Sequence, residues 1–420
     1  MNTRRGTPEA RRQMNPQRKA TTCATALLLA FLSAACSNRT AQPAQHAHPA
    51  RTHPIAVHTV VETFGVAGDK GAVLQTLHEA PTPIPGIVGT VVQIATSNSD
   101  TYALTSIGTV WAWGVANDGE LGNGSTPTYT GTATKVEFPS GVRISLLGNP
   151  MPFDGGLAID SRGDAWGWGL NAEGDLCLQN RLVALRPAEI PLTHVSLATG
   201  ARTHSLFDAN GSVYACGDGE YGELGNGSTA PRSVPARVVG LPEGGVKALT
   251  SSWGGSGALM DNGRYYDWGY NQAGQLGDGT TKDSDVPVHV SLPAAVVQVF
   301  QGGSGPANGQ TLAIVAGNSL WAWGNGTHGQ LGEDSTRSSP IPVRVTLPDG
   351  AKAAKVASGG FACYAIDEAG RLWAWGRDNF GQLGTGRAGP DRLTPVLAGL
   401  SLSEISSTAQ NVAGLADTPT

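Results

Sequence analysis

The residue types that most often carry catalysis or bind metals are sparse in this chain and lie apart. Five of the nine histidines come before residue 80, and the other four lie in separate stretches without metal-ligand spacing: His194, His204, His289 and His328. The acidic segment 278–285 contains glycine but lacks the ligand spacing of a calcium loop. We therefore predict no catalytic residue, no metal site and no cofactor.

Cysteines are the other residues that could do chemistry. Cys23 and Cys36 lie near the N-terminus, whereas Cys177, Cys216 and Cys363 are scattered through the rest of the chain. An odd number at non-periodic places is not typical of a disulfide framework. We expect these last three to be buried free thiols.

The N-terminal 35 residues are predicted to be a secretory signal peptide. Basic residues precede the apolar run 24–32, which is shorter than the ~20 residues of a membrane-spanning helix, and small residues then lead to Cys36. We expect Cys36 to be lipidated, with plain secretion after cleavage behind Ala35 as the alternative, and Met14 as an alternative start. Residues 36–55 are expected to be a flexible polar tether. The protein would then be exported, as a cell-envelope lipoprotein or a secreted protein.

The rest of the chain repeats one motif six times, most clearly at Leu372–Gly384. The motif is an aromatic residue, Gly, four free positions, Gly, one free position, Leu and Gly. It begins at Trp113, Trp168, Cys216, Trp268, Trp323 and Trp375, with Cys216 in place of an aromatic residue, so that the steps are 55, 48, 52, 55 and 52 residues. A period near fifty residues indicates a repeat array.

Each repeat predicts four short strands. Five residues before the aromatic position of the aromatic–Gly pair stands another Gly, or Asn318 in one repeat, as a hairpin position with positive φ requires. A short apolar run precedes this turn and the aromatic strand follows it. An inner strand lies upstream, and a polar, proline-containing edge strand lies downstream. Four strands per repeat are typical of a propeller blade.

Residues 56–420 are long enough for seven blades, and the seventh is predicted to be split between the two ends. Residues 405–415 match the inner strands 356–366 of the last full repeat, while Val60–Gly65 contains an aromatic–Gly pair, and Pro81, Pro83 and Pro85 match the outer strand. Pairing strands from both termini would close the ring and remove free edges. We therefore predict an all-β, seven-bladed β-propeller with four-stranded blades, one of them closed by N- and C-terminal strands.

Segments such as Val356–Gly360, Thr203–Ser205 and Leu372–Gly384 resemble the regulator of chromosome condensation repeat family. This resemblance implies a seven-bladed β-propeller. It also implies protein binding, since similar proteins include secreted bacterial inhibitors that clamp a β-lactamase on one rim. Nucleotide exchange on a small GTPase, the activity for which the family is named, is not expected of a chain with an export signal. His204 corresponds to a family histidine and is interpreted as a packing residue.

The favoured function is therefore non-catalytic protein binding outside the cytoplasm through one rim of the ring, by a monomer. The alternative is a carbohydrate-binding or enzymatic propeller, which would need a convergent polar cluster. A net charge of −5 and 15% charged residues give no sign of a nucleic-acid partner. The rim formed by the inner loops and the Gly-x4-Gly turns carries the side chains expected to contact an unidentified protein partner: Tyr221, Trp253, Phe361, Phe380, Phe153, Arg202 and His328.

Overall fold

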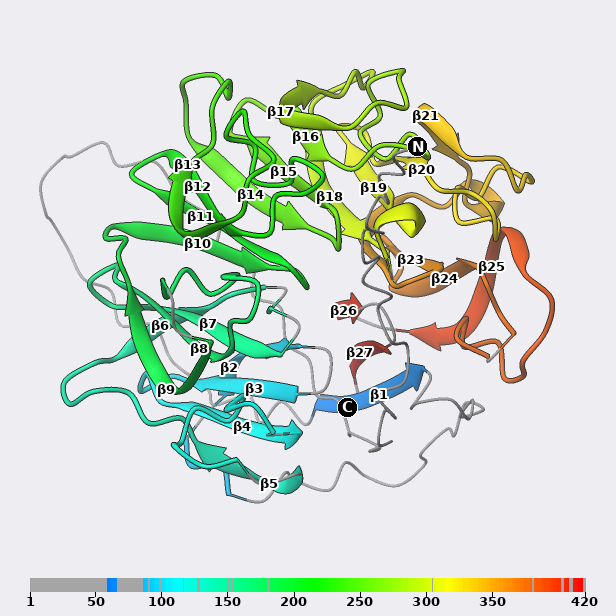
Figure 1. Cartoon of the computed structure of the whole chain (residues 1–420). Helices are drawn as coiled ribbons and strands as arrows, with labels where there is room; N and C mark the ends of the chain where they lie inside the picture. The colour runs from blue at the N-terminus through cyan, green and yellow to red at the C-terminus, as the bar shows by residue number, and fades with distance from the viewer. Residues whose placement is uncertain are drawn as a thin grey trace, which may run out of the picture.

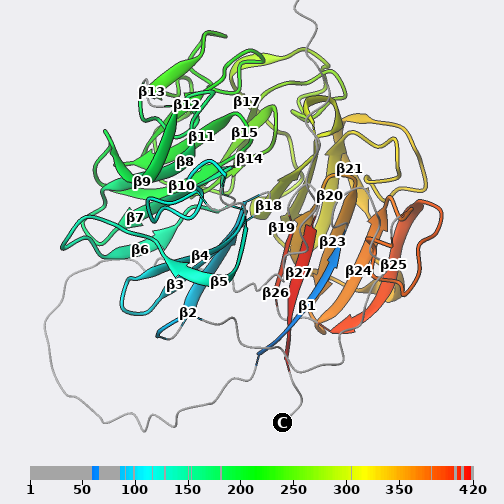
Figure 2. The same cartoon turned by 60° about the horizontal axis from the view of Figure 1, so that its bottom comes forward.

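The computed structural model describes residues 59–65, 86–401, 404–407 and 411–417, apart from gaps at 90, 98–99, 116, 127–128, 150, 153, 180–181, 304 and 380. The predicted signal peptide, Cys36 and the tether lie outside the described residues. The described strands form seven antiparallel sheets, placed around a common centre (Figures 1 and 2). This confirms the all-β propeller.

Six blades have four strands each, hydrogen-bonded in chain order. Blade I is β2 (Val91–Thr96), β3 (Asp100–Thr105), β4 (Val110–Val115) and β5 (Tyr129–Lys135). Blade II is β6 (Ile144–Leu147), β7 (Gly155–Asp160), β8 (Ala165–Leu170) and β9 (Val183–Ile190). Blade III is β10 (Val195–Gly200), β11 (His204–Ala209), β12 (Ser212–Gly217) and β13 (Arg232–Arg237).

The next three blades follow the same plan. Blade IV is β14 (Val246–Ser251), β15 (Gly255–Met260), β16 (Tyr265–Gly269) and β17 (Ser284–His289). Blade V is β18 (Val296–Gly302), β19 (Gln310–Val315), β20 (Ser319–Gly324) and β21 (Ser339–Val345). Blade VI is β22 (Ala353–Ser358), β23 (Ala362–Asp367), β24 (Arg371–Gly376) and β25 (Arg392–Ser401). Short 3₁₀ turns occur at η1 (Pro306–Asn308) and η2 (Pro348–Gly350).

Blade VII joins the two ends of the described chain, as predicted. It consists of β26 (Glu404–Ser407), β27 (Asn411–Asp417) and β1 (Thr59–Gly65), in the order β1-β27-β26. The first strand pairs antiparallel with the last, from Thr59 opposite Asp417 to Gly65 opposite Asn411. The prolines expected in an outer strand, at 81–85, lie outside the described residues.

The order of strands sets the radial arrangement. The first strands of neighbouring blades contact each other, as β10 and β14 do, and fourth strands such as β5, β13 and β25 lie at the periphery (Figure 1). The hairpin between the second and third strands has the left-handed residue that the repeat predicts, for example Gly108 at φ 79° and Asn318 at φ 61°. Other residue types rarely adopt this conformation, which explains the five glycines and one asparagine at this position.

The indoles of four aromatic–Gly pairs pack between neighbouring blades. Trp168, Trp268, Trp323 and Trp375 are fully buried. Each lies against the closing glycine of the preceding blade: a Cβ on Gly122 would stand 2.9 Å from Trp168 Cδ1. Three of the indoles also donate a hydrogen bond to a backbone carbonyl of that same turn, as Trp168 Nε1 does to Glu120 O at 2.9 Å. The motif is therefore the joint between neighbouring blades, which we call the seam.

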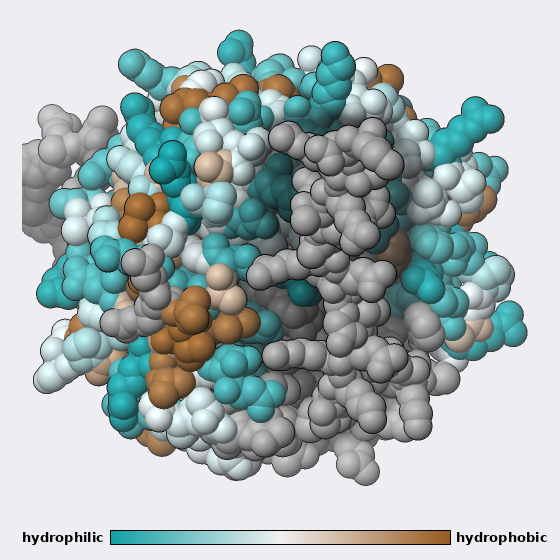
Figure 3. All heavy atoms as spheres, viewed as in Figure 1, coloured by the Kyte–Doolittle hydropathy of each residue, from teal (hydrophilic) through white to brown (hydrophobic). Residues whose placement is uncertain are grey.

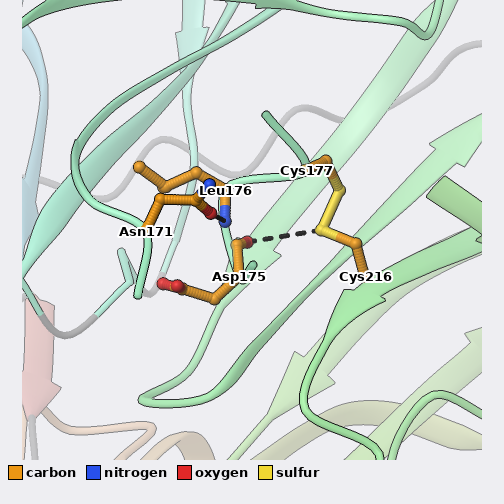
Figure 4. The surroundings of a disulfide bond; sticks show 5 residues. All are labelled: Asn171, Asp175, Leu176, Cys177 and Cys216. Carbon is orange, nitrogen blue, oxygen red and sulfur yellow. Dashed lines mark hydrogen bonds between the residues drawn. A yellow bond between two sulfur atoms is a disulfide. The ribbon is translucent and has the colours of Figure 1, made fainter. Parts of the chain in front are cut away.

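The seam between blades II and III is different. Cys177 occupies the closing-glycine position of blade II, with a glycine-like φ of 56°, and Cys216 occupies the tryptophan position of blade III. These two residues form a disulfide, and Cys216 Sγ lies 3.4 Å from the carbonyl oxygen of Asp175, the position that accepts the indole N–H in other seams (Figure 4). The expectation of free thiols is therefore wrong for this pair, because residues that look scattered along the chain meet at a seam. Cys363 is a buried free cysteine, as expected.

Candidate functional site

The loops of the ring divide into two sets by strand order. In an antiparallel meander, the loop between strands one and two and the loop between strands three and four emerge at the same edge of the sheet. We call the side of the ring formed by these loops the AB/CD face. The hairpins between strands two and three emerge on the other side. The predicted partner-binding residues that the structure describes all belong to the AB/CD face.

One cluster on this face spans the seam between blades III and IV. The guanidinium of Arg202, in the β10–β11 loop, lies 4.2 Å from the ring centroid of Trp253, in the β14–β15 loop. Thr203 Oγ1 donates to Trp253 O at 3.1 Å and fixes the same loop. Tyr270 N donates to the carbonyl oxygen of Gly254, the residue after Trp253, at 2.8 Å, and Tyr221 packs edge-to-face on Tyr270 with centroids 5.1 Å apart. Arg202 is exposed and the aromatic residues are half-buried, so this cluster is rigidly held and accessible.

A second cluster spans the seam between blades V and VI. His328, in the β20–β21 loop, packs edge-to-face on Phe361, in the β22–β23 loop, with centroids 5.0 Å apart. The guanidinium of Arg377 lies 5.2 Å from the Phe361 ring, and His328 Nδ1 lies 2.7 Å from Asp391 Oδ2. The structure thus brings Arg202, Trp253 and Tyr221 together in one cluster and His328 and Phe361 in another.

Two members of these clusters were missed by the sequence analysis, and two predicted residues cannot be placed. Phe153 and Phe380 lie outside the described residues, so their predicted role stays a prediction. Tyr270 and Arg377 were missed, although both directly follow the glycine of a Trp–Gly pair. The other repeats have Val115, Leu170, Asp218 and Asn325 at that position, so no shared residue type marked it in the sequence.

Buried carboxyl groups support the turns beneath the face. At the free position before the motif leucine stand Glu120, Asp175 and Glu223, which are Gln in blades IV to VI. Glu223 Oε2 accepts a hydrogen bond from Tyr221 N at 2.9 Å and so orders the turn that presents Tyr221. Burial raises the pKa of Glu120 to about 7, and the pKa values of Asp175 and Glu223 to about 8. These groups are structural acceptors, not exposed acids.

His204 belongs to the same scaffold. It is fully buried, and its Nε2 lies 2.8 Å from Ser256 Oγ, which in turn donates to Glu223 O at 2.7 Å. Burial lowers the pKa of His204 to about 4, so the ring is neutral at pH 7. This relay links blades III and IV through a closed set of hydrogen bonds, which supports the interpretation as a packing residue.

The hairpin face has a different character. Its turns are short and polar: Arg162 pairs with Asp160 and Asp164 at 2.9 and 3.1 Å, and Arg371 pairs with Asp367 at 2.7 Å. The one side of the molecule that Figure 3 shows, taken without regard to face, is mostly hydrophilic, with its hydrophobic side chains in separate patches. Arg371 also lies 5.2 Å from the ring centroid of Trp373, but Trp373 is buried. Among the described residues, half-buried aromatic rings paired with an arginine therefore distinguish the AB/CD face from the hairpin face.

The described part of the chain holds no group of three or more His, Cys, Asp or Glu side chains arranged to bind a metal ion. Within that same part, no helix has the length and apolar character for a membrane crossing.

The chain is similar to parts of longer proteins. The ultraviolet-B receptor UVR8 of Arabidopsis thaliana is 31% identical over 287 residues, which cover 66% of this chain and 63% of the receptor. The human E3 ubiquitin-protein ligase HERC2 is 27% identical over 333 residues, which cover 76% of this chain and 7% of that protein. The chain thus spans less than two thirds of the length of either relative.

Solved structures share the fold. Human WBSCR16 superposes with a TM-score of 0.70 at 20% identity, covering 87% of this chain and 100% of that one. Prp20p of Saccharomyces cerevisiae superposes with a TM-score of 0.68 at 18% identity, covering 87% and 93%. The model of the regulator of chromosome condensation (RCC1) repeat matches residues 210–259, 262–305, 318–366 and 369–409. The chain therefore carries RCC1 repeats and folds as a β-propeller like these structures.

Proposed function

We propose that this propeller is a non-catalytic binding protein that holds a protein partner on its AB/CD face. The observation that carries the proposal is the pair of clusters around Trp253 and Phe361. Each combines aromatic rings with an arginine, the side chains most often found as interface anchors. Contacts across the seams hold these side chains in place, so that binding would cost little side-chain entropy.

The relatives support a binding role. The structural report on Prp20p names binding to Gsp1p and histones, and UVR8 is named as a receptor. These partners belong to those proteins, whereas the partner of this chain would be a protein that fits two clusters at seams two blades apart.

Export is the second part of the proposal. The Cys177–Cys216 disulfide supports it, because disulfides persist in oxidising compartments outside the cytoplasm. Lipidation at Cys36 would hold the propeller at a membrane surface through one anchor. Mass spectrometry of the mature N-terminus tests this part, and an unmodified or absent Cys36 would contradict lipidation.

The binding proposal is tested by single substitutions of Tyr221, Trp253 and Phe361 to Ala. Partner capture from envelope or medium extracts, followed by titration with the identified partner, should show a loss of about 1–4 kcal/mol in affinity for each true anchor. Melting temperature measured on the same samples separates loss of contact from loss of fold.

Arg162→Ala and Glu368→Ala, both on the hairpin face, are the matched controls and should leave capture unchanged. Equal loss from these controls would contradict the choice of face. Capture that survives all three AB/CD substitutions would contradict the proposed anchors.

A further inference from the structure

Blade IV departs from the repeat at one buried position. Asp267, in β16, stands where the other complete blades have Ala112, Gly167, Ala215, Ala322 and Ala374. Its cross-strand neighbour is Gly257, whereas those blades place a Tyr or a Leu opposite the small residue. The exchange puts a carboxylate inside the ring wall, where five other blades have none.

Asp267 is fully buried and only partly satisfied. Gln301 Nε2, from β18 of blade V, donates to Asp267 Oδ1 at 2.7 Å, while Oδ2 has no hydrogen-bond partner. Among the described residues, no Lys, Arg or His pairs with it. Burial raises the pKa of Asp267 well above its ordinary value, an effect that hydrogen bonding from the backbone N–H of Trp268 and from the side chains of Gln301 and Tyr265 reduces only in part. A buried carboxylate without a counter-charge is costly, so a compensating group is expected.

Two further acceptors lie in the same place. Gln310 Nε2 bonds Ser358 Oγ at 2.7 Å and Gly359 O at 3.0 Å, which fixes its amide with Oε1 turned away from these acceptors. Gln310 Oε1 and Gln301 Oε1 both lack a partner, and the residues are 1% and 8% exposed. Asp267, Gln301 and Gln310 line one small pocket between blades IV and V, beneath loops of the AB/CD face. The pocket has room for about one water-sized particle.

We propose that this pocket binds a monovalent metal cation, Na⁺ or K⁺, through Asp267 Oδ2, Gln301 Oε1 and Gln310 Oε1. One carboxylate balances a single positive charge, and the other ligands are neutral oxygens. Calcium sites use more carboxylate ligands than this pocket offers, and zinc sites use His and Cys ligands, which the pocket lacks. The ion joins blade IV to blade V and replaces the apolar packing that the other blades have at this position.

The test compares the full chain in KCl, NaCl and choline chloride at equal ionic strength, because choline is too large for the pocket. The melting temperature is expected to be higher in at least one metal salt than in choline chloride, by about 2 °C or more. Asp267→Ala, which installs the residue of four other blades, should abolish this difference. Asp267→Asn, which keeps the volume, serves the same purpose if the alanine variant folds poorly.

Asp261→Asn, an exposed carboxylate in the hairpin of the same blade, is the matched control and should keep the difference. Crystals soaked in Rb⁺ or Tl⁺ should give an anomalous peak within coordination distance of the three named oxygens. Equal melting in all three salts, as expected for a protonated Asp267 beside a water molecule, would overturn the proposal. So would an Asp267→Ala variant that retains the salt difference, or crystals without the peak.

Discussion

Loss of the inter-blade disulfide should weaken the whole ring. The perturbation is the double substitution Cys177→Ser/Cys216→Ser, which leaves the seam between blades II and III with neither a cross-link nor an indole. The two cysteines are 39 residues apart. For a closed loop of that length, the chain-entropy relation gives about 4 kcal/mol of stabilisation from the cross-link. The free energy of unfolding should fall by an amount of that order.

A second variant rebuilds the seam of the other blades. Cys177→Gly/Cys216→Trp restores the glycine and the indole, and the new Nε1–H would have Asp175 O as its acceptor, as Trp168 has Glu120 O. This variant should recover part of the loss, because it regains buried apolar contact and about one hydrogen bond. Comparing the two variants separates the contribution of the covalent bond from that of seam packing.

Urea unfolding followed by tryptophan fluorescence measures these differences as a shift in midpoint, with peptide mapping under non-reducing conditions to establish the bond. The serine variant should unfold at lower urea, and reduction of the native protein should give the same shift. The reasoning is refuted if Cys177 and Cys216 are both alkylated without reduction, or if the serine variant keeps the native midpoint at the same slope.

Three further predictions concern the same architecture. Burial raises the pKa of Glu223 to about 8 from 4.5, so the stability it contributes is full below about pH 4.5 and is lost as the pH rises through 8. Glu223→Gln, which keeps a side-chain oxygen as acceptor for Tyr221 N, should therefore flatten the pH dependence of the melting temperature. It should also stabilise the protein at pH 8 by up to a few kcal/mol. An unchanged pH profile would contradict the assignment of Glu223 as a buried acid. Trp168→Phe should lower the free energy of unfolding in urea by about 1 kcal/mol more than Trp323→Phe, because Trp168 Nε1 has an acceptor and Trp323 Nε1 has none. Equal losses would show that the indole hydrogen bond across the seam does not add to stability. Deleting residues 56–66 removes β1 and should lower the melting temperature of the whole domain, since each blade is stabilised by its neighbours; loss confined to one blade in hydrogen exchange would argue against cooperative closure.

The sequence alone determined the architecture of this protein. Short strands and the left-handed turn residues between them are set by the local sequence. The repeat therefore predicted the four strands of a blade, with a glycine or Asn318 in the hairpin between the second and third strands. The end segments carried halves of one repeat, which predicted the pairing of β1 with β27. The aromatic positions recur in register, at steps of 48 to 55 residues, which indicated the repeat array itself. Each inference needed only comparison of one repeat with another.

The tertiary structure decided what happens where different repeats touch. Cys177 and Cys216 depart from the repeat at two different positions, and only the seam register shows that those positions are neighbours. The same holds for Tyr270 beside Tyr221, and for Asp267 beside Gln301 of the next blade. The repeated sequence specifies the strands and turns within each blade. Contacts across a seam depend instead on how two twisted sheets pack against each other. That packing brings together residues from different blades that occupy different positions in the repeat.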